Sequence, residues 1–345
     1  MLRSSWLAAT VVLVAGIASA ADHPTAAVGK AMSTAANDVS ATLTPAEKAK
    51  VVKSFDDPGR VDWHNIPKPE RKGLQIREMK AATRDKVQQL LKVSLSEEGY
   101  EKAQRIMALE SNLREGEKSL TGSPLRDPER YFLSIFGQPG VTGQWGWSFE
   151  GHHLSLNFVI QDSAVISDSP SFWGANPATV HLFVPGGPEK GVRTLAKEEQ
   201  IAFDLLDSLN DAQRSKAIIS GKAPSDYRAA GQAQPPKTAQ EGVPARELND
   251  AQKKTLQLLL ENYVGHLAKP LAEVKLAQLK ADGWEQVYFA WAGSTKPGVG
   301  HYYRVEGPSF VLELVNVQSD PQGNVANHIH SVWRNPKGDF GLAAK

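Results

Sequence analysis

The chain has 345 residues, and its 39 basic side chains almost balance its 38 acidic ones. This balance argues against a nucleic-acid partner, which needs a basic surplus, and it gives no reason to expect binding to an anionic membrane surface. The absence of cysteine excludes disulfides, thiolate metal sites, iron–sulfur clusters and a thiol nucleophile. A chain of this length can bury a hydrophobic core without disulfides.

The first twenty residues have the three parts of a secretory signal peptide. Arg3 provides the positive charge, an apolar run follows over residues 6–17, and residues 18–20 (Ala-Ser-Ala) form a small-residue cleavage site. The run is shorter than the about 20 residues of a membrane span. We therefore expect cleavage before Ala21 and a secreted or periplasmic protein with no membrane span. Removing residues 1–20 leaves 38 basic against 38 acidic side chains, a net charge near zero.

The rest of the chain is predicted to begin with a flexible segment, followed by helices. Residues 21–42 are rich in Ala, Ser and Thr without apolar periodicity, which predicts a flexible lead-in. A single globular domain is expected over residues 43–345. Its first helix is indicated by Thr44-Pro45-Ala46-Glu47, a capping box with proline at the first helical position. Helical patterns continue to about residue 115.

Strand and helix patterns then alternate. Residues 130–185 are rich in β-branched and aromatic residues, helices return at 196–219 and 250–281, and further strands are predicted over 284–333. Between the later helices, residues 224–244 are dense in Gly, Ala, Gln and Pro and are predicted to form a surface linker. The fold class is α+β, with antiparallel sheets built from hairpins and helices packed on one side.

The order helices, strands, helices, strands suggests an internal duplication with halves at 43–185 and 196–341. Trp147-Ser148-Phe149-Glu150-Gly151 and Tyr303-Arg304-Val305-Glu306-Gly307 are similar and 156 positions apart, and apolar residues alternate after both. The alternative is two unrelated hairpins, because hairpins with similar turns resemble one another. A second echo, Leu-Asn-Asp-Ala-Gln at 209–213 and at 248–252, is explained by ordinary helix capping.

Several longer motifs resemble the secreted domain-of-unknown-function 3500 family. They are Gly151-His152-His153-Leu154-Ser155-Leu156-Asn157, Arg126-Asp127-Pro128-Glu129-Arg130-Tyr131, Phe136-Gly137, Trp145-Gly146-Trp147, Phe172-Trp173-Gly174-Ala175-Asn176-Pro177, His301-Tyr302-Tyr303-Arg304, Asn327-His328-Ile329-His330-Ser331-Val332-Trp333-Arg334 and Asp339-Phe340-Gly341. The resemblance covers about Thr44 to Gly341 and implies no activity. The chain departs from the family pattern at Val315, where an acid is expected, and in a short tail without a further histidine.

The candidate site is a metal centre of three histidines and a glutamate. His328 and His330 alternate in a strand pattern, so both imidazoles project from one face. His153 opens another predicted strand. Glu313 lies among apolar strand residues, where an unpaired carboxylate is costly. Together they could hold one divalent transition metal ion, with zinc, manganese, iron and copper all possible. The structural alternative is that the histidines hydrogen-bond to backbone carbonyls and that Glu313 forms an ion pair with Arg304 or Arg334.

Three further residues are candidate catalytic groups beside that centre. Arg304 and Arg334 could bind an anionic part of a small-molecule substrate, since a guanidinium suits a carboxylate or a phosphate. Tyr302 shares a strand face with Arg304 and could donate a proton. Ion pairs and sheet packing are the alternative roles of these side chains.

Two classes of function therefore remain. The first is an exported metal-dependent enzyme, with hydrolysis as the simplest reaction because it needs no second cofactor. Oxygen chemistry at a two-histidine, one-carboxylate centre is the next possibility. The second class is a non-catalytic ligand-binding protein with a groove lined by arginines and by aromatic residues such as Trp145, Trp147, Trp173 and Trp291. No serine-hydrolase elbow, Walker loop or dinucleotide fingerprint occurs in the sequence.

Overall fold

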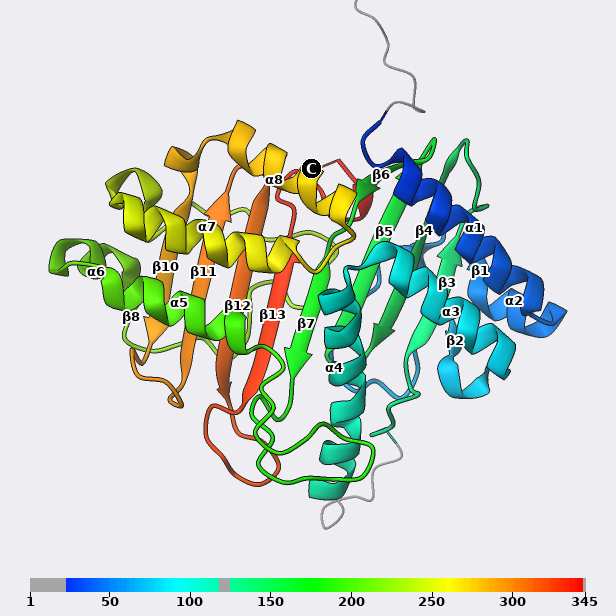
Figure 1. Cartoon of the computed structure of the whole chain (residues 1–345), viewed down its shortest axis with the longest axis horizontal. Helices are drawn as coiled ribbons and strands as arrows, with labels where there is room; N and C mark the ends of the chain where they lie inside the picture. Colours follow the sequence, from blue (N-terminus) through cyan, green and yellow to red (C-terminus); the bar gives the residue numbers. More distant parts are fainter. Residues whose placement is uncertain (1–22, 118–124, 344–345) are drawn as a thin grey trace, which may run out of the picture.

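A computed structural model describes residues 23–117 and 125–343 (Figure 1). The predicted signal peptide and its cleavage site lie outside these residues. The described chain forms one sheet of thirteen strands, with the long helices over one of its faces. The expected α+β class is confirmed. Within the described residues, no helix is both long and apolar enough to cross a membrane.

The strand order reads almost the same from either edge of the sheet. The path through the sheet, in spatial order, is β1 (Val52–Lys53), β3 (Phe132–Phe136), β4 (Gln144–Gly151), β5 (Leu154–Gln161), β7 (Ser171–Ala175), β13 (His328–Arg334), β12 (Phe310–Gln318), β11 (His301–Gly307), β10 (Tyr288–Gly293) and β8 (Ile218–Ser220). Beside this path, β2 (Leu74–Gln75) pairs with β3, β6 (Ala164–Ser167) with β5, and β9 (Val243–Pro244) with β10. Most pairs are antiparallel; β1–β3 and β8–β10 are parallel.

The helices follow the same twofold plan. They are α1 (Ala26–Thr42), α2 (Pro45–Val51), α3 (Ala81–Ser94) and α4 (Glu97–Gly116) over the first half of the sheet, and α5 (Ala196–Ser208), α6 (Asp211–Ala217), α7 (Asp250–Val264) and α8 (Lys269–Asp282) over the second (Figure 1). Capping boxes begin α2 at Thr44, α6 at Asn210 and α7 at Asn249. The glutamine side chains of the two later boxes, Gln213 and Gln252, also hydrogen-bond to each other.

Strand register supports a repeat at the level of single residues. Trp147 pairs with Ile135 on one side and Phe158 on the other. Tyr303 pairs with Trp291 and Leu314, so all three positions are shifted by the same 156 residues. Two unrelated hairpins have no reason to agree in register on both sides and in their parallel edge strands as well.

The expected flexible lead-in at residues 21–42 is wrong, because most of it is helix α1. Met32, Ala36 and Val39 are fully buried in the core. The abundance of small residues reflects close packing: a Cβ on Gly29 would lie 1.8 Å from the Ser163 carbonyl oxygen. Alanine also has the highest helix propensity. Small side chains here allow a helix to approach the sheet closely rather than leaving the chain unfolded.

The expected surface linker at 224–244 is also wrong, because part of it covers the second face of the sheet. Tyr227 is 3% exposed and its hydroxyl donates to Asn65 Oδ1. The aromatic and aliphatic side chains on this face form a separate cluster: Trp63, Phe172, Tyr227, Val332 and Phe340. The last residues of the segment form the strand β9. Helices therefore cover one face of the sheet, and loops cover the other.

Candidate metal centre

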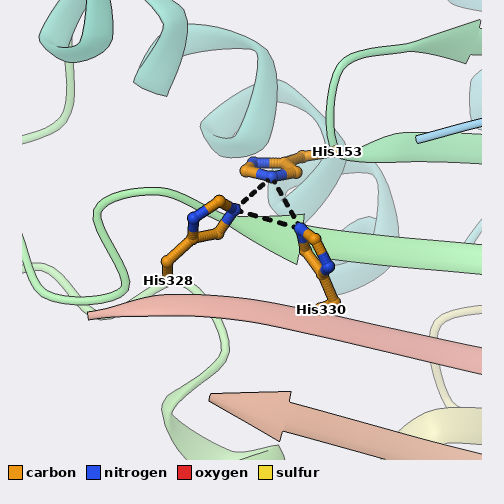
Figure 2. Close-up of side chains that lie close together, drawn as sticks. All are labelled: His153, His328 and His330. Atoms are coloured by element: carbon orange, nitrogen blue, oxygen red, sulfur yellow. Dashed lines mark hydrogen bonds between the residues drawn. The ribbon is translucent and has the colours of Figure 1, made fainter. Parts of the chain in front are cut away.

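Three imidazoles meet at the end of the central strands, on the face that the loops cover. The Nε2 atoms of His153, His328 and His330 are 2.8 Å (153–328), 3.0 Å (328–330) and 3.2 Å (153–330) apart. Figure 2 shows the three rings pointing towards one common point from two separate segments of the chain. His153 and His330 are buried and His328 is half-buried, so the group approaches solvent on the side of His328.

Two of the rings are placed by strand geometry. His328 and His330 alternate in β13, which sends both side chains to the same face, as the sequence predicts. The third ring comes from a turn: β4 ends at Gly151 and β5 begins at Leu154, so His153 lies in the two-residue connection between them. The expectation that His153 belongs to the strand is therefore wrong by one residue, although its ring reaches the predicted face.

His153 has an unusual backbone conformation, which two backbone hydrogen bonds hold in place. Its φ is 63°, a left-handed value that few non-glycine residues adopt. Its backbone N–H donates to the Asn65 carbonyl at 3.0 Å, and its carbonyl accepts from the Gly174 N–H at 2.7 Å. A backbone outlier fixed by contacts with two other segments is typical of a functional position.

Gly174 makes room for the His153 ring. It lies opposite His330 in the β7–β13 pair. A Cβ at this position would lie 2.9 Å from both Cγ and Cδ2 of His153. Only glycine therefore lets the ring reach the other two imidazoles without a shift, and the Phe-Trp-Gly-Ala motif contributes this small residue to the site.

The three short contacts cannot all be hydrogen bonds. An imidazole Nε2 has one position in the ring plane, which holds either a hydrogen or a lone pair. Each nitrogen can therefore donate or accept, but it cannot do one with each neighbour. A cation near the common point satisfies three lone pairs together. In a tetrahedral site with metal–nitrogen bonds of about 2.0–2.1 Å, ligand nitrogens are about 3.3–3.4 Å apart, slightly farther than here.

The opposite ring nitrogens have partners of the kind that metal-bound histidines use. Nδ1 of His330 is 2.9 Å from Oδ1 of Asp226, which lies in the segment expected to be a linker. Nδ1 of His328 is 3.2 Å from Nδ2 of Asn176, while the buried Oδ1 of Asn176 has no partner. Exchanging the amide oxygen and nitrogen of Asn176 lets Oδ1 accept from Nδ1–H, which satisfies both groups and leaves Nε2 free to bind a metal.

Burial keeps the imidazoles of His153 and His328 neutral. It lowers the pKa of His153 well below its usual value, with further lowering by the charges of His152, His328 and His330. Burial, His330 and Arg126 lower the pKa of His328 to about 3. Histidines bind metals as neutral bases, so the site is prepared to bind a cation at neutral pH without first losing protons.

A second layer of polar side chains supports His153. The His152 ring stacks on the His153 ring with centroids 3.6 Å apart. Its Nδ1 is 2.5 Å from Oε1 of Glu110, a buried residue of α4. Burial raises the pKa of Glu110 to about 8, against the opposing charge of Arg126. Asp226 and Glu110 have no local sequence signal as site residues, because they meet the histidines only through the fold. Gly174 and Asn176 lie in a quoted family motif, but the motif by itself gives them no role.

Glu313, the fourth predicted ligand, is not brought into the histidine group. It does share a face with His330, since Val315 pairs with His330 and Glu313 lies two residues along β12. Its carboxylate is instead occupied by the Tyr302 hydroxyl at 2.7 Å and by the backbone N–H and Nε of Arg228, each at 3.1 Å. Glu313 therefore forms an ion pair with an arginine, as the structural alternative expects. The arginine is Arg228, however, and not Arg304 or Arg334.

The predicted catalytic residues also have structural partners. Tyr302 donates to Glu313; Arg304 forms ion pairs with Glu306 and Glu241. The buried Arg334 has Nε 2.5 Å from Oδ2 of Asp339 and donates to the Gln232 carbonyl. These contacts hold the loops against the sheet, and a catalytic role for the three residues stays a prediction. The tryptophans at 145, 147, 173 and 291 are at most 4% exposed, so they form core rather than an aromatic platform.

The chain belongs to the DUF3500 family. The family, described as proteins of unknown function, matches residues 25–342, which begin at helix α1 and include all three histidines. Comparisons with curated proteins and with solved structures gave no match. Family membership is thus established without any activity attached to it, and the chemistry must be argued from the site.

Proposed function

We propose that this DUF3500 protein is an exported metal-dependent enzyme, in which one divalent transition metal ion is bound by His153, His328 and His330. The observation that carries the proposal is the convergence of three Nε2 atoms, no more than 3.2 Å apart, that cannot all hydrogen-bond to one another. The outer contacts of Asp226 and Asn176 support it, because they hold Nδ1–H and direct the Nε2 lone pairs inward.

The donor set favours a catalytic over a structural ion. Structural zinc sites use four protein ligands, whereas catalytic centres use three and leave a position for water or substrate. Among the described residues, the group contains three histidines and no fourth ligand. Three imidazoles suit zinc, copper and iron better than manganese, which prefers oxygen ligands. A two-histidine, one-carboxylate centre is disfavoured because Glu313 is paired elsewhere.

Hydrolysis of a small-molecule substrate is the reaction class that needs the fewest additional components. A divalent ion at the triad would act as a Lewis acid on a substrate oxygen and would lower the pKa of a bound water. Asp226 and Asn176 would orient the imidazoles of His330 and His328 that bind the ion. The competing class, a non-catalytic binding protein with an aromatic groove, loses its main support because the four tryptophans are buried.

Metal analysis tests the proposal directly. The protein is purified without chelators, its metal content is measured, and the metal-free form is titrated with zinc, copper and iron(II). We expect about one ion per chain, with an X-ray absorption spectrum that shows three imidazole nitrogens at about 2.0–2.1 Å for zinc. A protein that neither retains nor takes up a stoichiometric ion contradicts the proposal.

Export is the second part of the proposal and rests on residues 1–20 alone. N-terminal sequencing of the protein recovered from the periplasm or medium should give Ala21 as the first residue. Recovery only from the cytoplasm, with Met1 in place, would contradict it. The absence of disulfides is compatible with either compartment, so cleavage is the decisive measurement.

A further inference from the structure

A cavity of about 180 Å³ lies under helix α8, away from the three clustered histidines. Its apolar walls come from Leu271 and Val274 of α8 and from Trp333, near the end of β13. Trp333 is three residues beyond His330 along β13, so its side chain points to the opposite face, the one that the helices cover. The exposed side chain of Gln278 lines the same cavity, which therefore has an edge at the surface of α8.

The two charged groups of this cavity neutralise each other. Lys275 Nζ is 2.5 Å from Asp168 Oδ1 and 4.8 Å from the centroid of the Trp333 ring. The two charged side chains are 18% and 15% exposed. A ligand carboxylate would meet the negative charge of Asp168, and a ligand cation would meet the positive charge of Lys275. The ion pair therefore favours a ligand without net charge.

A smaller space of about 20 Å³ adjoins this cavity, since Asp168, Lys275 and Trp333 line both. His266, which follows α7, also lines the smaller space. It is 2% exposed, and its Nδ1 has no hydrogen-bond partner within residues 23–117 and 125–343. A buried nitrogen without a partner is uncommon in folded proteins, so this one indicates a group that the chain itself does not supply.

The contacts of the other ring nitrogen decide what Nδ1 can offer. Nε2 of His266 is 2.6 Å from Nζ of Lys102, a buried ammonium that can only donate. Glu198 Oε1 is farther from Nε2, at 3.2 Å, and accepts from the same ammonium. Burial, followed by the charge of Lys102, lowers the pKa of His266 and keeps its ring neutral. Nε2 therefore accepts, and Nδ1 carries the hydrogen and points an unused donor at the smaller space.

The two spaces together describe the shape of a ligand. An apolar cavity of about 150 Å³ holds one benzene molecule. The larger space, at about 180 Å³, therefore has room for a single six-membered ring against Trp333. The smaller space, at about 20 Å³, has room for one oxygen-sized atom beside His266.

We propose that this cavity is a second ligand site, which binds a neutral molecule with one ring and one hydrogen-bond-accepting oxygen, such as a phenol or a cyclic ketone. The ring lies in the larger space, and the oxygen accepts from Nδ1–H of His266. This site is separate from the proposed metal centre, because it lies on the opposite face of the sheet and shares no residue with the histidine group.

The test is a calorimetric titration of the full-length protein with phenol, with toluene and with benzoate. Toluene has the size of phenol without its oxygen, and benzoate carries a charge. The same titrations are made on Val274→Trp, which fills the larger space, and on Ala277→Trp, an exposed position of the same helix that serves as the control. Circular dichroism and thermal unfolding of both variants are measured first.

We expect one phenol per chain, bound at least about 10-fold more tightly than toluene, because the oxygen gains a hydrogen bond. Benzoate should bind more weakly than phenol, since its charge meets that of Asp168. Val274→Trp should lower the phenol affinity at least about 10-fold, and Ala277→Trp should leave it unchanged. The proposal is overturned by a wild type that does not bind phenol, that binds toluene or benzoate as tightly, or whose phenol affinity survives in Val274→Trp.

The donor is tested in wild type, so that no buried residue is replaced. Nuclear magnetic resonance of protein with isotope-labelled histidine reports the Nδ1–H of His266. Phenol should shift this resonance, and toluene should leave it in place. A resonance that phenol does not move would mean that water alone fills the smaller space, which overturns the assignment of the ligand oxygen.

Discussion

The two halves of the sheet share one fold and differ at one turn. In the first half β4 and β5 are joined through His152 and His153, and in the second half β11 and β12 are joined through Pro308 and Ser309. His153 has a left-handed φ, while Pro308 and Ser309 do not. Strand pairing is identical around both turns. The repeated strands therefore provide a common scaffold, and of the two turns only the first carries a member of the histidine triad.

The helices beside the two turns also place different side chains next to them. In the first half, Glu110 of α4 lies against His152. In the second half, Lys275 of α8 forms an ion pair with Asp168 and lines, with Ser309, a cavity of about 180 Å³. One end of the sheet thus has converging imidazoles above an acid, and the other has a lysine–aspartate pair. Changes at the first turn should therefore affect metal binding, and equivalent changes at the second should not.

The largest effect is expected from removing two of the three rings. His328→Ala with His330→Ala should reduce bound metal from about one ion per chain to none, since one imidazole alone cannot hold a divalent ion. The circular dichroism spectrum should stay close to that of wild type, because the ion is not needed to form the sheet. His181→Ala, an exposed histidine, is the control and should retain its ion. Full metal content in the double variant would eliminate the triad as the site.

Glu110, the acid beside the first turn, should make the free energy of unfolding depend on pH. The folded pKa of Glu110 is about 8, against an ordinary value of 4.5. Between these values the folded chain keeps a proton that the unfolded chain has lost. The free energy of unfolding should therefore decrease as pH rises from about 4.5 to 8, by up to a few kcal/mol in total.

Glu110→Gln removes this titration. Urea unfolding of the metal-free protein at several pH values should then show a flatter slope than wild type over the same range. Glu101→Gln, on the exposed face of the same helix, should keep the wild-type slope. Equal slopes for Glu110→Gln and wild type would show that the carboxyl is ionised in the folded protein.

Gly174→Ala tests whether the His153 ring needs the space beneath it. The added Cβ would meet two ring atoms at 2.9 Å, so the ring must move away from the other imidazoles. We expect a loss of at least about 10-fold in metal affinity, since ligands must be held to within about 0.5 Å, and a stability cost of about 1–3 kcal/mol. Gly300→Ala, whose nearest contact would be an ordinary 3.5 Å, should change neither quantity. Unchanged zinc affinity in Gly174→Ala would contradict the assigned position of His153.

Asp226→Asn tests the outer contact of His330. Loss of the carboxylate weakens the hold on Nδ1–H and lowers the basicity of Nε2, so metal affinity should fall about 10- to 100-fold. Competition titration with a chelating dye measures this range. Glu241→Gln, an exposed acid in the same segment that contacts Arg304, is the matched control. An equal effect of both changes would mean that the segment acts through its overall charge.

The smallest effect separates the backbone of the turn from its ligand. His153→Gly and His153→Ala both lose the imidazole, but only glycine tolerates φ of 63° without strain. Chemical unfolding of the metal-free variants should show the glycine variant more stable by about 1 kcal/mol. At the equivalent position in the second turn, Ser309→Gly should have no such advantage over Ser309→Ala. Equal behaviour of the two positions would remove the difference between the turns.

The sequence by itself determined the elements that depend on local pattern. Alternation in β13 put His328 and His330 on one face, and the capping box at Thr44 gave the start of α2. These predictions held because strand parity and capping are set by neighbouring residues. Even the face of Glu313 was correct, since parity alone decides it.

Only the tertiary structure decided which groups meet. Asp226 reaches His330 across 104 positions, Arg228 takes the carboxylate of Glu313 across 85, and Arg126 reaches His152 across 26. The segment that carries Asp226 and Arg228 has a composition typical of a linker, and α1 has one typical of a flexible tail. Composition reports what a segment can do alone, whereas the energy of burying it depends on the surface it packs against. Helix α1 finds that surface on α3 and β6, and Tyr227 of the other segment finds it on Phe172 and Val332 of the central strands.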